Sequence, residues 1–339
     1  MISIFKRFFS TKNIPVVQNG TDSALENFII GLHKSKLTLI KKGIGALNPS
    51  DVVLITAFNN DDNFIRIFLE HYKRIGIRKF AFINNNSSDK TDQIIEAFAI
   101  CQGVHIDIWR TNDKYNGRKM MGWRQRLILH YGLNRWYIIP DSDELLVFDG
   151  ANINDLIARL ERDKMQAAGA VMIDMYSKLP LNRVGKIPPE DILSEYKYFD
   201  TNTYKTYFDR RCFVVMGGMR NRIFGLLPWL QKFPVIYAKK DTLGVHSHYW
   251  YPYDINQNSK ILAALLHYKF LPGDSEKYVA HAKSGIYYNN SSEYKAYVAK
   301  IAENPGLSFY DSATSREYKD FDSLKDVIEG INGNYTRFI

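Results

Sequence analysis

The sequence predicts an α/β fold in which a mostly parallel central sheet is flanked by helices. Strand-like runs alternate with helical runs from residue 52 to residue 139, which is the pattern of a parallel sheet with crossover helices. The strand-like runs are rich in β-branched and aromatic residues, which suits strands that are buried on both faces. Short polar turns follow two of these runs. Together these observations favour a doubly wound sheet.

Each element of this sheet follows from the spacing of its apolar residues. A β-branched run covers residues 52–58, and Phe64, Ile67, Phe68 and Tyr72 then recur at helical spacing. The alternation continues to residue 176. The expected strands are 52–58, 79–83, 104–109, 136–139 and 170–176, and the expected helices are 64–75, 91–100, 122–132 and 152–164.

Segments of different character flank this domain. Apolar residues between residues 24 and 44 recur at helical spacing and predict one or two amphipathic helices. Residues from about 275 onward are rich in Tyr, Lys and Glu and predict further helices. The expected organisation is an N-terminal helical segment (1–48), a main domain (49–274, with halves 49–150 and 151–274) and a C-terminal helical extension (275–339).

The composition excludes several classes of protein. Apolar residues make up 45% and charged residues 24% of the chain, the balance of a soluble globular protein. A net charge of +9 would attract nucleic acid, anionic lipid or phosphorylated ligands, but the chain has none of the zinc-finger, homeodomain or RNP signatures of a nucleic-acid reader. We therefore expect no nucleic-acid partner. Cys101 and Cys212 lie far apart, which favours two free thiols in a reducing compartment.

The sequence predicts no membrane-spanning helix, because no stretch approaches the roughly 18 to 20 apolar residues that a span needs. The first twelve residues, MISIFKRFFSTK, are basic and rich in Phe but lack the apolar core and cleavage site of a secretory signal. This segment suits contact with an anionic bilayer surface, or is a frayed terminus. We expect a cytoplasmic protein with possible peripheral contact at the inner face of a membrane.

The strand at residues 136–139 runs directly into a group of acidic residues. Asp141 and Asp143 flank Ser142, and alternation along an extended chain points both carboxylates to one side. Mg²⁺ and Mn²⁺ bind one or two carboxylates together with substrate phosphates, so this group could hold a metal and a diphosphate. The alternative is a solvated turn in which Glu144 begins a helix.

A second polar turn, residues 84–89, follows the second strand. In open parallel sheets, ligands bind outside the carboxyl ends of the strands, so this turn could hold the base and ribose of a nucleotide. Short polar side chains such as those of Asn84, Asn86 and Asp89 also close turns through backbone hydrogen bonds, and turn chemistry alone would explain them.

At this point the chain resembles the family-2 type of glycosyltransferases, in particular a bacterial subgroup with an N-N-S-S/T-D turn and a D-x-D-E motif. The likeness covers most of the chain. Its first part is ITAFNNDDNFIRIFLEHYKRIGIRKFAFINNNSSDKT, and its more specific part is RWYIIPDSDELLVF. GGMRNRIFG at residues 217–225, GVHSH at 244–248 and ALLHYKF at 264–270 look like further elements of that subgroup.

The resemblance implies a GT-A-like (Rossmann-like) fold and a divalent metal, Mn²⁺ or Mg²⁺. It implies transfer from a nucleoside-diphosphate sugar, with UDP expected, and in most members with inversion. The acceptor would be a glycan, a lipid-linked sugar or a cell-envelope polysaccharide, and residues 177–207 would form an acceptor loop or lid. Carried over by position, Asp143 would bind the metal directly, Asp141 would contact the metal or the ribose, and His267 would be a third metal ligand. The nucleoside residues would be Thr56, Asn84, Asn86 and Asp89, and the diphosphate residues Ser142, Arg222 and Lys269.

Two features qualify these assignments. Many relatives have an acidic residue where this chain has Asn84, so the contact with the base is expected to differ. His246 and His248 compete with His267 for the role of metal ligand, and the HSH sequence could itself suggest a transition-metal site. Two histidines at this spacing without a companion Cys or His-Glu motif are weak evidence for one.

An inverting transfer needs a carboxylate that removes the proton of the acceptor hydroxyl. Asp174 in VMIDMYS is the first candidate, followed by Asp209 and Glu144. Each of these carboxylates could instead pair with a nearby Arg or Lys.

Two rival functions stay open. One is a catalytically inactive nucleotide-sugar or carbohydrate-binding protein on the same fold, against which the intact D-x-D argues. The other is a nucleotidyltransferase or another Mg²⁺ enzyme. Such an enzyme usually has a Gly-rich, basic loop after the first strand, and ITAFNNDDN contains no glycine.

Overall fold

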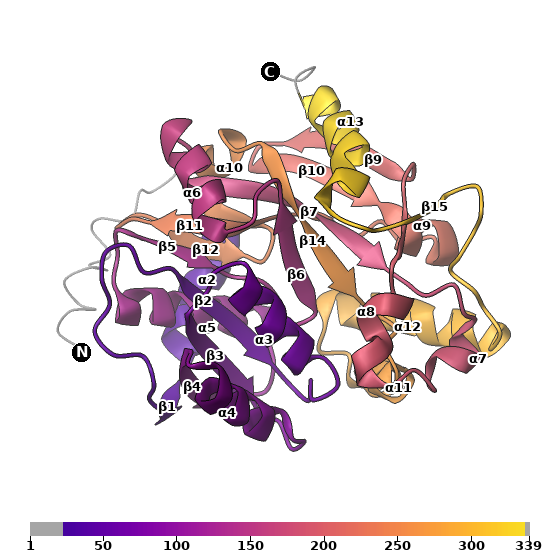
Figure 1. The fold of residues 1–339 in the computed structure, drawn as a ribbon, viewed down its shortest axis with the longest axis horizontal. Coiled ribbons are helices and arrows are strands. Elements are labelled where there is room, and N and C mark those ends of the chain that lie inside the picture. Colours follow the sequence, from indigo (N-terminus) through magenta and orange to yellow (C-terminus); the bar gives the residue numbers. More distant parts are fainter. Residues whose placement is uncertain (1–22, 336–339) are drawn as a thin grey trace.

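A nine-stranded sheet forms the centre of the described residues, 23–335, in the computed structural model (Figure 1). The strand order is β1-β4-β3-β2-β5-β11-β7-β14-β6. Strands β2, β3, β4, β5, β7 and β14 run in one direction, and β1, β11 and β6 run against them. The predicted α/β fold with a mostly parallel sheet flanked by helices is therefore confirmed.

The first half of the chain alternates strands and helices much as the sequence predicts. Its elements are α2 (Ser23–Lys34), β1 (Thr38–Lys41), β2 (Val53–Phe58), α3 (Ile65–Arg74), β3 (Lys79–Asn85), α4 (Thr91–Gln102), β4 (His105–Thr111), α5 (Gly117–Tyr131), β5 (Arg135–Ile138), β6 (Glu144–Phe148) and α6 (Ile153–Arg162).

The second half adds the remaining strands of the sheet, three small two-stranded sheets and a C-terminal group of helices. Its elements are β7 (Ala167–Met175), α7 (Leu181–Val184), η2 (Pro189–Asp191), α8 (Ile192–Glu195), β8 (Tyr198–Asp200), β9 (Tyr204–Asp209), β10 (Cys212–Gly217), α9 (Gly218–Phe224), β11 (Gln231–Ala238), β12 (Leu243–His246), β13 (Tyr249–Tyr251), α10 (Asp254–Gln257), β14 (Ile261–Tyr268), α11 (Asp274–Ser284), α12 (Tyr288–Glu303), β15 (Ser315–Glu317), η3 (Phe321–Leu324) and α13 (Lys325–Tyr335).

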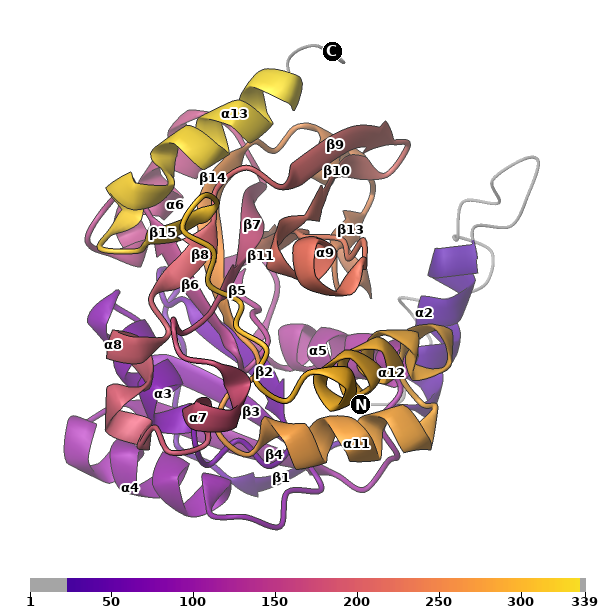
Figure 2. The same ribbon diagram turned by 90° about the vertical axis from the view of Figure 1, so that its right-hand side faces the viewer.

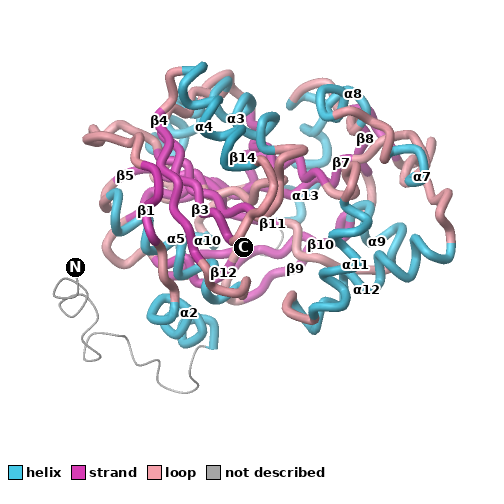
Figure 3. The backbone as a smooth tube through the Cα atoms, turned by 90° about the horizontal axis from the view of Figure 1, so that it is seen from below, coloured by secondary structure: helices cyan, strands magenta, loops and turns pink. Residues whose placement is uncertain are grey.

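Alternate residues of the sheet pack into two cores on its opposite faces. Leu54, Phe80 and Phe82 belong to the core under α3, α4 and α6, whereas Val53 and Ile55 belong to the core under α2 and α5. Figure 2 shows these two helical layers on either side of the strands, and Figure 3 shows the same layers from below. The period of two along each strand thus buries both faces of the sheet.

Two local expectations are wrong. Residues 38–41 were expected to be helical, but they form β1, an edge strand that pairs antiparallel with β4. Asp107 of β4 holds this segment by accepting hydrogen bonds from the backbone N–H groups of Gly43 (2.7 Å) and Ile44 (2.8 Å). The alternative in which Glu144 begins a helix is also wrong, because Glu144 begins strand β6.

Residues 1–22 lie outside the described part of the chain. They include residues 1–12, for which membrane contact was expected, and the first part of the expected N-terminal helical segment. Within residues 23–335, no helix is both long enough and apolar enough to cross a bilayer. The domain boundaries at 48/49, 150/151 and 274/275 stay predictions.

Helix α2 approaches α5 closely through two glycines. A Cβ atom at Gly31 would lie 2.1 Å from the carbonyl oxygen of Arg118, and one at Gly122 would lie 2.7 Å from the carbonyl oxygen of Gly31. We predict that Gly31→Ala separates these helices and lowers the free energy of unfolding by about 1–3 kcal/mol, as overpacking does. Urea unfolding followed by circular dichroism measures this change.

Gly330→Ala in α13 is the matched control, because a Cβ atom there would meet nothing within 4 Å. It should leave stability unchanged or raise it by up to about 1 kcal/mol through helix propensity. Equal effects of the two substitutions would contradict close α2–α5 packing.

Candidate active site

A cleft of about 350 Å³ opens at the edge of the central sheet where its six co-directional strands end. Its walls come from the ends of β2, β3 and β14, from the starts of β6 and β11, and from α11 and α12. Ligands of open α/β sheets bind outside this edge, because the loops after the strands collect there. The cleft is therefore the candidate active site.

Residues 139–143 connect β5 to β6, and Asp141, Ser142 and Asp143 of this loop line the cleft. Asp141 accepts a hydrogen bond from Arg124 Nη2 at one carboxylate oxygen and from Lys232 Nζ at the other, each at 2.5 Å. Burial alone would raise the pKa of Asp141, but the charges of Lys232 and Arg124 outweigh it and hold this pKa well below its usual range. Asp141 is thus ionised, with both oxygens already engaged.

Glu144 is fully buried and shares Lys232 with Asp141. Its carboxylate accepts a hydrogen bond from Lys232 Nζ and another from the backbone N–H of Asp141 at 2.9 Å. Burial raises the pKa of Glu144, with Lys232 acting against this effect. Lys232 comes from β11, the neighbour of β5 in the sheet, so strand pairing places this buried cation opposite the acidic loop.

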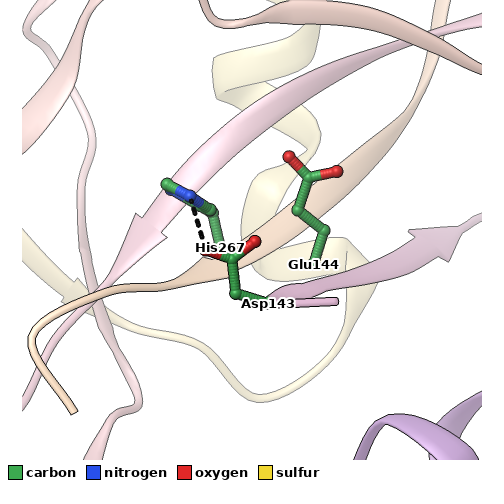
Figure 4. Close-up of side chains that lie close together, drawn as sticks. All are labelled: Asp143, Glu144 and His267. Carbon is green, nitrogen blue, oxygen red and sulfur yellow. Dashed lines mark ion pairs between the residues drawn. The ribbon is translucent and has the colours of Figure 1, made fainter. Parts of the chain in front are cut away.

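Asp143 turns toward a different partner. His267 Nε2 lies 3.4 Å from its carboxylate, and 38% of the Asp143 side chain is exposed to the cleft. Burial would raise the pKa of Asp143, but His267 and Lys269 lower it to about 2. Ligand atoms of Asp143, Glu144 and His267 all lie within 4.8 Å of one another. Figure 4 shows the Asp143–His267 pair with Glu144 beside it.

Strand register places His267 between two acidic residues. On β14 it stands opposite Glu144 of β6 and beside Asp174 of β7. Its Nδ1 atom lies 2.6 Å from Asp174 Oδ1. Burial lowers the pKa of His267, but Asp143 and Asp174 together raise it. The two carboxylates therefore favour a positive charge at this point, on the ring or on a bound cation.

These residues fit a divalent cation. Asp143 offers an ionised, accessible oxygen, and a hydrogen bond between Nδ1 of His267 and Asp174 leaves Nε2 facing the same space. Metal-binding histidines typically have such a carboxylate at the other ring nitrogen. The predicted ligands Asp143 and His267 thus come together, with Glu144 as third member. Asp141, in contrast, is held by Arg124 and Lys232 and is not part of this cluster.

The residues predicted to bind the nucleoside do not line the cleft. Asn84 is fully buried and binds Asp92 at 2.8 and 2.9 Å, which turns its side chain toward α4. Its side-chain oxygen Oδ1 also closes the turn by accepting a hydrogen bond from the backbone N–H of Ser87. The alternative reading as turn chemistry describes these residues in the structure. The predicted nucleoside residues that do not line the cleft are Thr56, Asn84, Asn86 and Asp89.

Neighbouring residues line the cleft instead. Asn85 follows Asn84 along β3, and strand alternation turns its side chain to the opposite face. It lines the cleft together with Asn59, whose Nδ2 donates to the backbone oxygen of Asn85 at 2.6 Å. Tyr115 and Trp123 complete this wall. Any nucleoside at this edge would contact these residues rather than Asn84.

The two cations predicted for a diphosphate lie in different places. Lys269 lines the cleft two residues after His267, with its ammonium 5.4 Å from the centre of the Tyr294 ring. Arg222 is outside the cleft, where it binds Asp200 through two hydrogen bonds of 2.8 and 2.7 Å. Ser142 lines the cleft, and its hydroxyl donates to Asp61 at 2.5 Å.

The predicted general bases also separate. Glu144 lines the cleft, but Asp174 is buried beneath His267 and pairs with Arg220 at 2.9 Å. Asp209 pairs with Arg211 at 2.6 Å and lies outside the cleft, as the alternative reading of an ion pair allowed. The role of any of these carboxylates as a base stays a prediction. Among the competing histidines, His248 lines the cleft but His246 does not, and neither belongs to the acidic cluster.

Several residues of the cleft were missed at the level of sequence. Asp61, in the loop after β2, accepts from Ser142 and from Lys277 Nζ at 3.0 Å, and so joins the acidic loop to α11. The acidic pair in NNDDN after the first strand was a signal for it. Lys232, Arg124 and Arg220 carried no local signal, because their acidic partners are distant in sequence.

Comparisons with known proteins do not identify a family. No family model matches the chain, and no curated protein matches it. Among solved structures, S. aureus TarS is 13% identical over 76% of this chain and 44% of TarS, with a TM-score of 0.33. This chain thus spans less than half of TarS. Part of TarS, residues 1–349, has also been crystallised with UDP.

Two further structures match parts of the chain. A glucosyl-3-phosphoglycerate synthase from Mycobacterium tuberculosis, in complex with Mn²⁺, UDP and glucosyl-3-phosphoglycerate, is 11% identical over 43% of this chain and 50% of its own, with a TM-score of 0.24. A 4-diphosphocytidyl-2C-methyl-D-erythritol synthase is 8% identical over 38% and 63%, with a TM-score of 0.27. Because all these values are low, the function must be inferred from the chain's own residues.

The Lys232 ammonium neutralises two carboxylates away from water. We predict that Lys232→Met lowers the free energy of unfolding by about 3–5 kcal/mol, because it leaves buried charge without a partner. Adding Glu144→Gln in the same chain should restore part of the loss. Urea unfolding at neutral pH with EDTA measures both changes.

Lys300→Met is the control, since Lys300 forms an exposed pair with Glu303 on α12. Exposed pairs contribute little, so this change should cost less than about 1 kcal/mol. A similarly small effect of Lys232→Met would contradict the central place of Lys232 in the site.

Proposed function

We propose that the protein is a metal-dependent glycosyltransferase. It would move a sugar from a nucleoside-diphosphate sugar, with UDP as the expected nucleotide, to a glycan, lipid-linked or cell-envelope polysaccharide acceptor, with inversion. The observation that carries the proposal is the cluster of Asp143, Glu144 and His267, which lies in a cleft at the carboxyl edge of the sheet. The low-similarity neighbours described above do not carry it.

Asp143 and His267 would hold the metal, with Glu144 at its far side. A bound Mn²⁺ or Mg²⁺ would neutralise the charge that builds on the departing diphosphate. Asp141 would act differently from the sequence expectation: it pairs with Arg124 and with Lys232, which also lines the cleft, and so fixes the loop that presents Asp143. This arrangement supports one directly binding aspartate in the D-x-D motif.

The diphosphate would lie beside Lys269 and Lys277. Lys269 has no carboxylate partner among the ion pairs of the described residues, and it lines the cleft just after the end of β14 at Tyr268. Lys277 of α11 also lines the cleft and pairs with Asp61. Charge-assisted hydrogen bonds from such groups bind phosphate oxygens well. We do not retain Arg222 for this role, because Asp200 engages it outside the cleft.

The donor's nucleoside would occupy the wall made by the ends of β2 and β3. Asn59 and Asn85 offer amide groups there, and Tyr115, whose ring stacks on that of Tyr287 at 5.0 Å, lines the same wall. Of the carboxylates predicted as the general base, Glu144 is the one that lines the cleft, and its raised pKa suits that role. Peripheral membrane contact and a cytoplasmic location remain part of this proposal.

The second candidate is a nucleotide-sugar or carbohydrate-binding protein without catalysis. The observation that favours it is the complete pairing of Asp141 with Arg124 and Lys232, which removes one of the two aspartates of the motif from the accessible cluster. Binding without turnover would distinguish this candidate from the enzyme.

The test is hydrolysis of UDP-, GDP-, CMP- and dTDP-sugars with Mn²⁺ or with EDTA. We expect metal-dependent release of one nucleotide, and a loss of about 100-fold or more in rate for Asp143→Asn, since a metal supplies several kcal/mol of charge stabilisation. Asp322→Asn makes the same chemical change at an exposed site paired with Lys325 and should have no effect.

Each other outcome has a distinct meaning. Metal-dependent binding of a nucleotide sugar without release, even with a panel of glycan acceptors, would favour the binding protein. Neither binding nor turnover with any nucleotide sugar, together with no binding to the glycan panel, would contradict both candidates.

A further inference from the structure

Asp174 lies beneath the candidate metal site and is part of a series of buried ion pairs. Its second oxygen, Oδ2, accepts a hydrogen bond from Arg220 Nε at 2.9 Å, while Oδ1 faces His267. Arg220 Nη1 in turn donates to Glu293 Oε1 at 3.0 Å. The chain therefore runs from Asp143 through His267, Asp174 and Arg220 to Glu293.

Burial increases along this chain toward its middle. The side chains of Asp174 and Arg220 are 2% and 4% exposed, whereas that of Glu293 is 36% exposed, and both Arg220 and Glu293 line the cleft. Arg220 carries a further nitrogen, Nη2, for which the described residues provide no hydrogen-bond partner. Buried ion pairs are often no more stabilising than apolar packing of similar volume, so stability alone is a weak reason for this arrangement.

Two glycines with positive φ angles position the helix that carries Arg220. Gly217 and Gly218 have φ angles of 116° and 70°, and they turn the chain from β10 into the short helix α9 that carries Arg220. A Cβ atom at Gly217 would lie 1.9 Å from the carbonyl oxygen of Thr203. The tight turn thus depends on glycine and places the guanidinium beneath β14.

Glu293 connects the same chain to the C-terminal helices. It comes from α12, which lies beside α11 toward the lower right of Figure 2. The Tyr297 hydroxyl, one turn along α12, also donates to Glu293. Both hydrogen bonds are accepted by the same oxygen, Oε1, and Arg220 pairs with a strand of the sheet through Asp174 and with a helix of the C-terminal segment through Glu293.

We propose that Arg220 and Glu293 are positioning residues for the metal ligand His267, so that the C-terminal helix α12 completes the candidate metal site. Arg220 occupies one oxygen of Asp174 and fixes its carboxylate plane, which keeps the other oxygen aimed at Nδ1 of His267. Nε2 then faces Asp143. Glu293 holds the guanidinium in the orientation that this geometry requires. This inference rests on the proposed metal site, but it concerns residues that do not touch the metal.

The test is Mn²⁺ affinity, measured by titration calorimetry on the full chain, together with the melting temperature in EDTA. Partners of metal-binding histidines typically contribute about 10–100-fold in affinity, so Asp174→Asn should weaken binding by that factor. Arg220→Lys cannot contact both Asp174 and Glu293 as the guanidinium does, and it should weaken Mn²⁺ binding about 10-fold. Glu293→Gln should weaken it roughly threefold, and the exposed control Glu303→Gln should not.

A double variant separates positioning from general stability. If Glu293 acts through Asp174, Glu293→Gln should have no further effect on Mn²⁺ affinity in the Asp174→Asn background. Lower melting temperatures with unchanged Mn²⁺ affinity for Glu293→Gln would overturn the inference, even if Arg220→Lys fails to fold. Unchanged affinity for Asp143→Asn and His267→Gln as well would instead show that the proposed metal site is wrong.

Discussion

Charge compensation at one edge of the sheet is the constraint on which the rest of the site depends. Asp141 and Asp143 lie in the loop between β5 and β6, Glu144 begins β6 and Asp174 lies near the end of β7. Burial at this edge of the sheet makes uncompensated carboxylates costly. Four cationic or protonatable groups meet them from separate elements: Arg124 of α5, Lys232 of β11, Arg220 of α9 and His267 of β14. The acidic residues can therefore be buried at this edge only because these four elements bring their cationic or protonatable groups to it.

The compensation of these carboxylates is uneven. Asp141 and Glu144 are held by short contacts to buried cations, although 34% of the Asp141 side chain is exposed. Asp143 faces only a histidine at 3.4 Å and keeps 38% of its side chain exposed. A cation that enters the cleft would therefore meet Asp143 and His267 first, with the rest of the network as a rigid support.

The sequence was sufficient for features that depend on local pattern. Alternating apolar runs predicted the strands and helices between residues 52 and 176, apart from β6, because burial on both faces leaves a strong local signal. The D-x-D run was correctly placed after a strand end. Residues 38–41 were not predicted as a strand. This four-residue edge strand is stabilised by pairing with β4 and has no strand-like pattern of apolar residues of its own. Asn84 was chosen over Asn85, although one step along a strand exchanges the buried and the accessible face.

The partners of the acidic residues were beyond sequence reasoning for a different physical reason. Lys232 lies 91 residues from Asp141, and Arg220 lies 46 residues from Asp174. Only the order of strands in the sheet brings these pairs together, and a lone Lys or Arg in an apolar run carries no mark of its partner. The same applies to Glu293, which a C-terminal segment delivers to a cleft formed mainly by the sheet.

The central claim is that Asp143 and His267, supported by Asp174, form a divalent metal site. Anomalous diffraction at the manganese edge, from crystals grown with Mn²⁺ and UDP, tests it most directly. The account predicts a manganese peak within coordinating distance, about 2.0–2.3 Å, of Asp143 and of Nε2 of His267, with Lys232 still bound to Asp141 and Glu144. A peak at Asp141 with Lys232 displaced, or no peak in the cleft while UDP is bound, would contradict it.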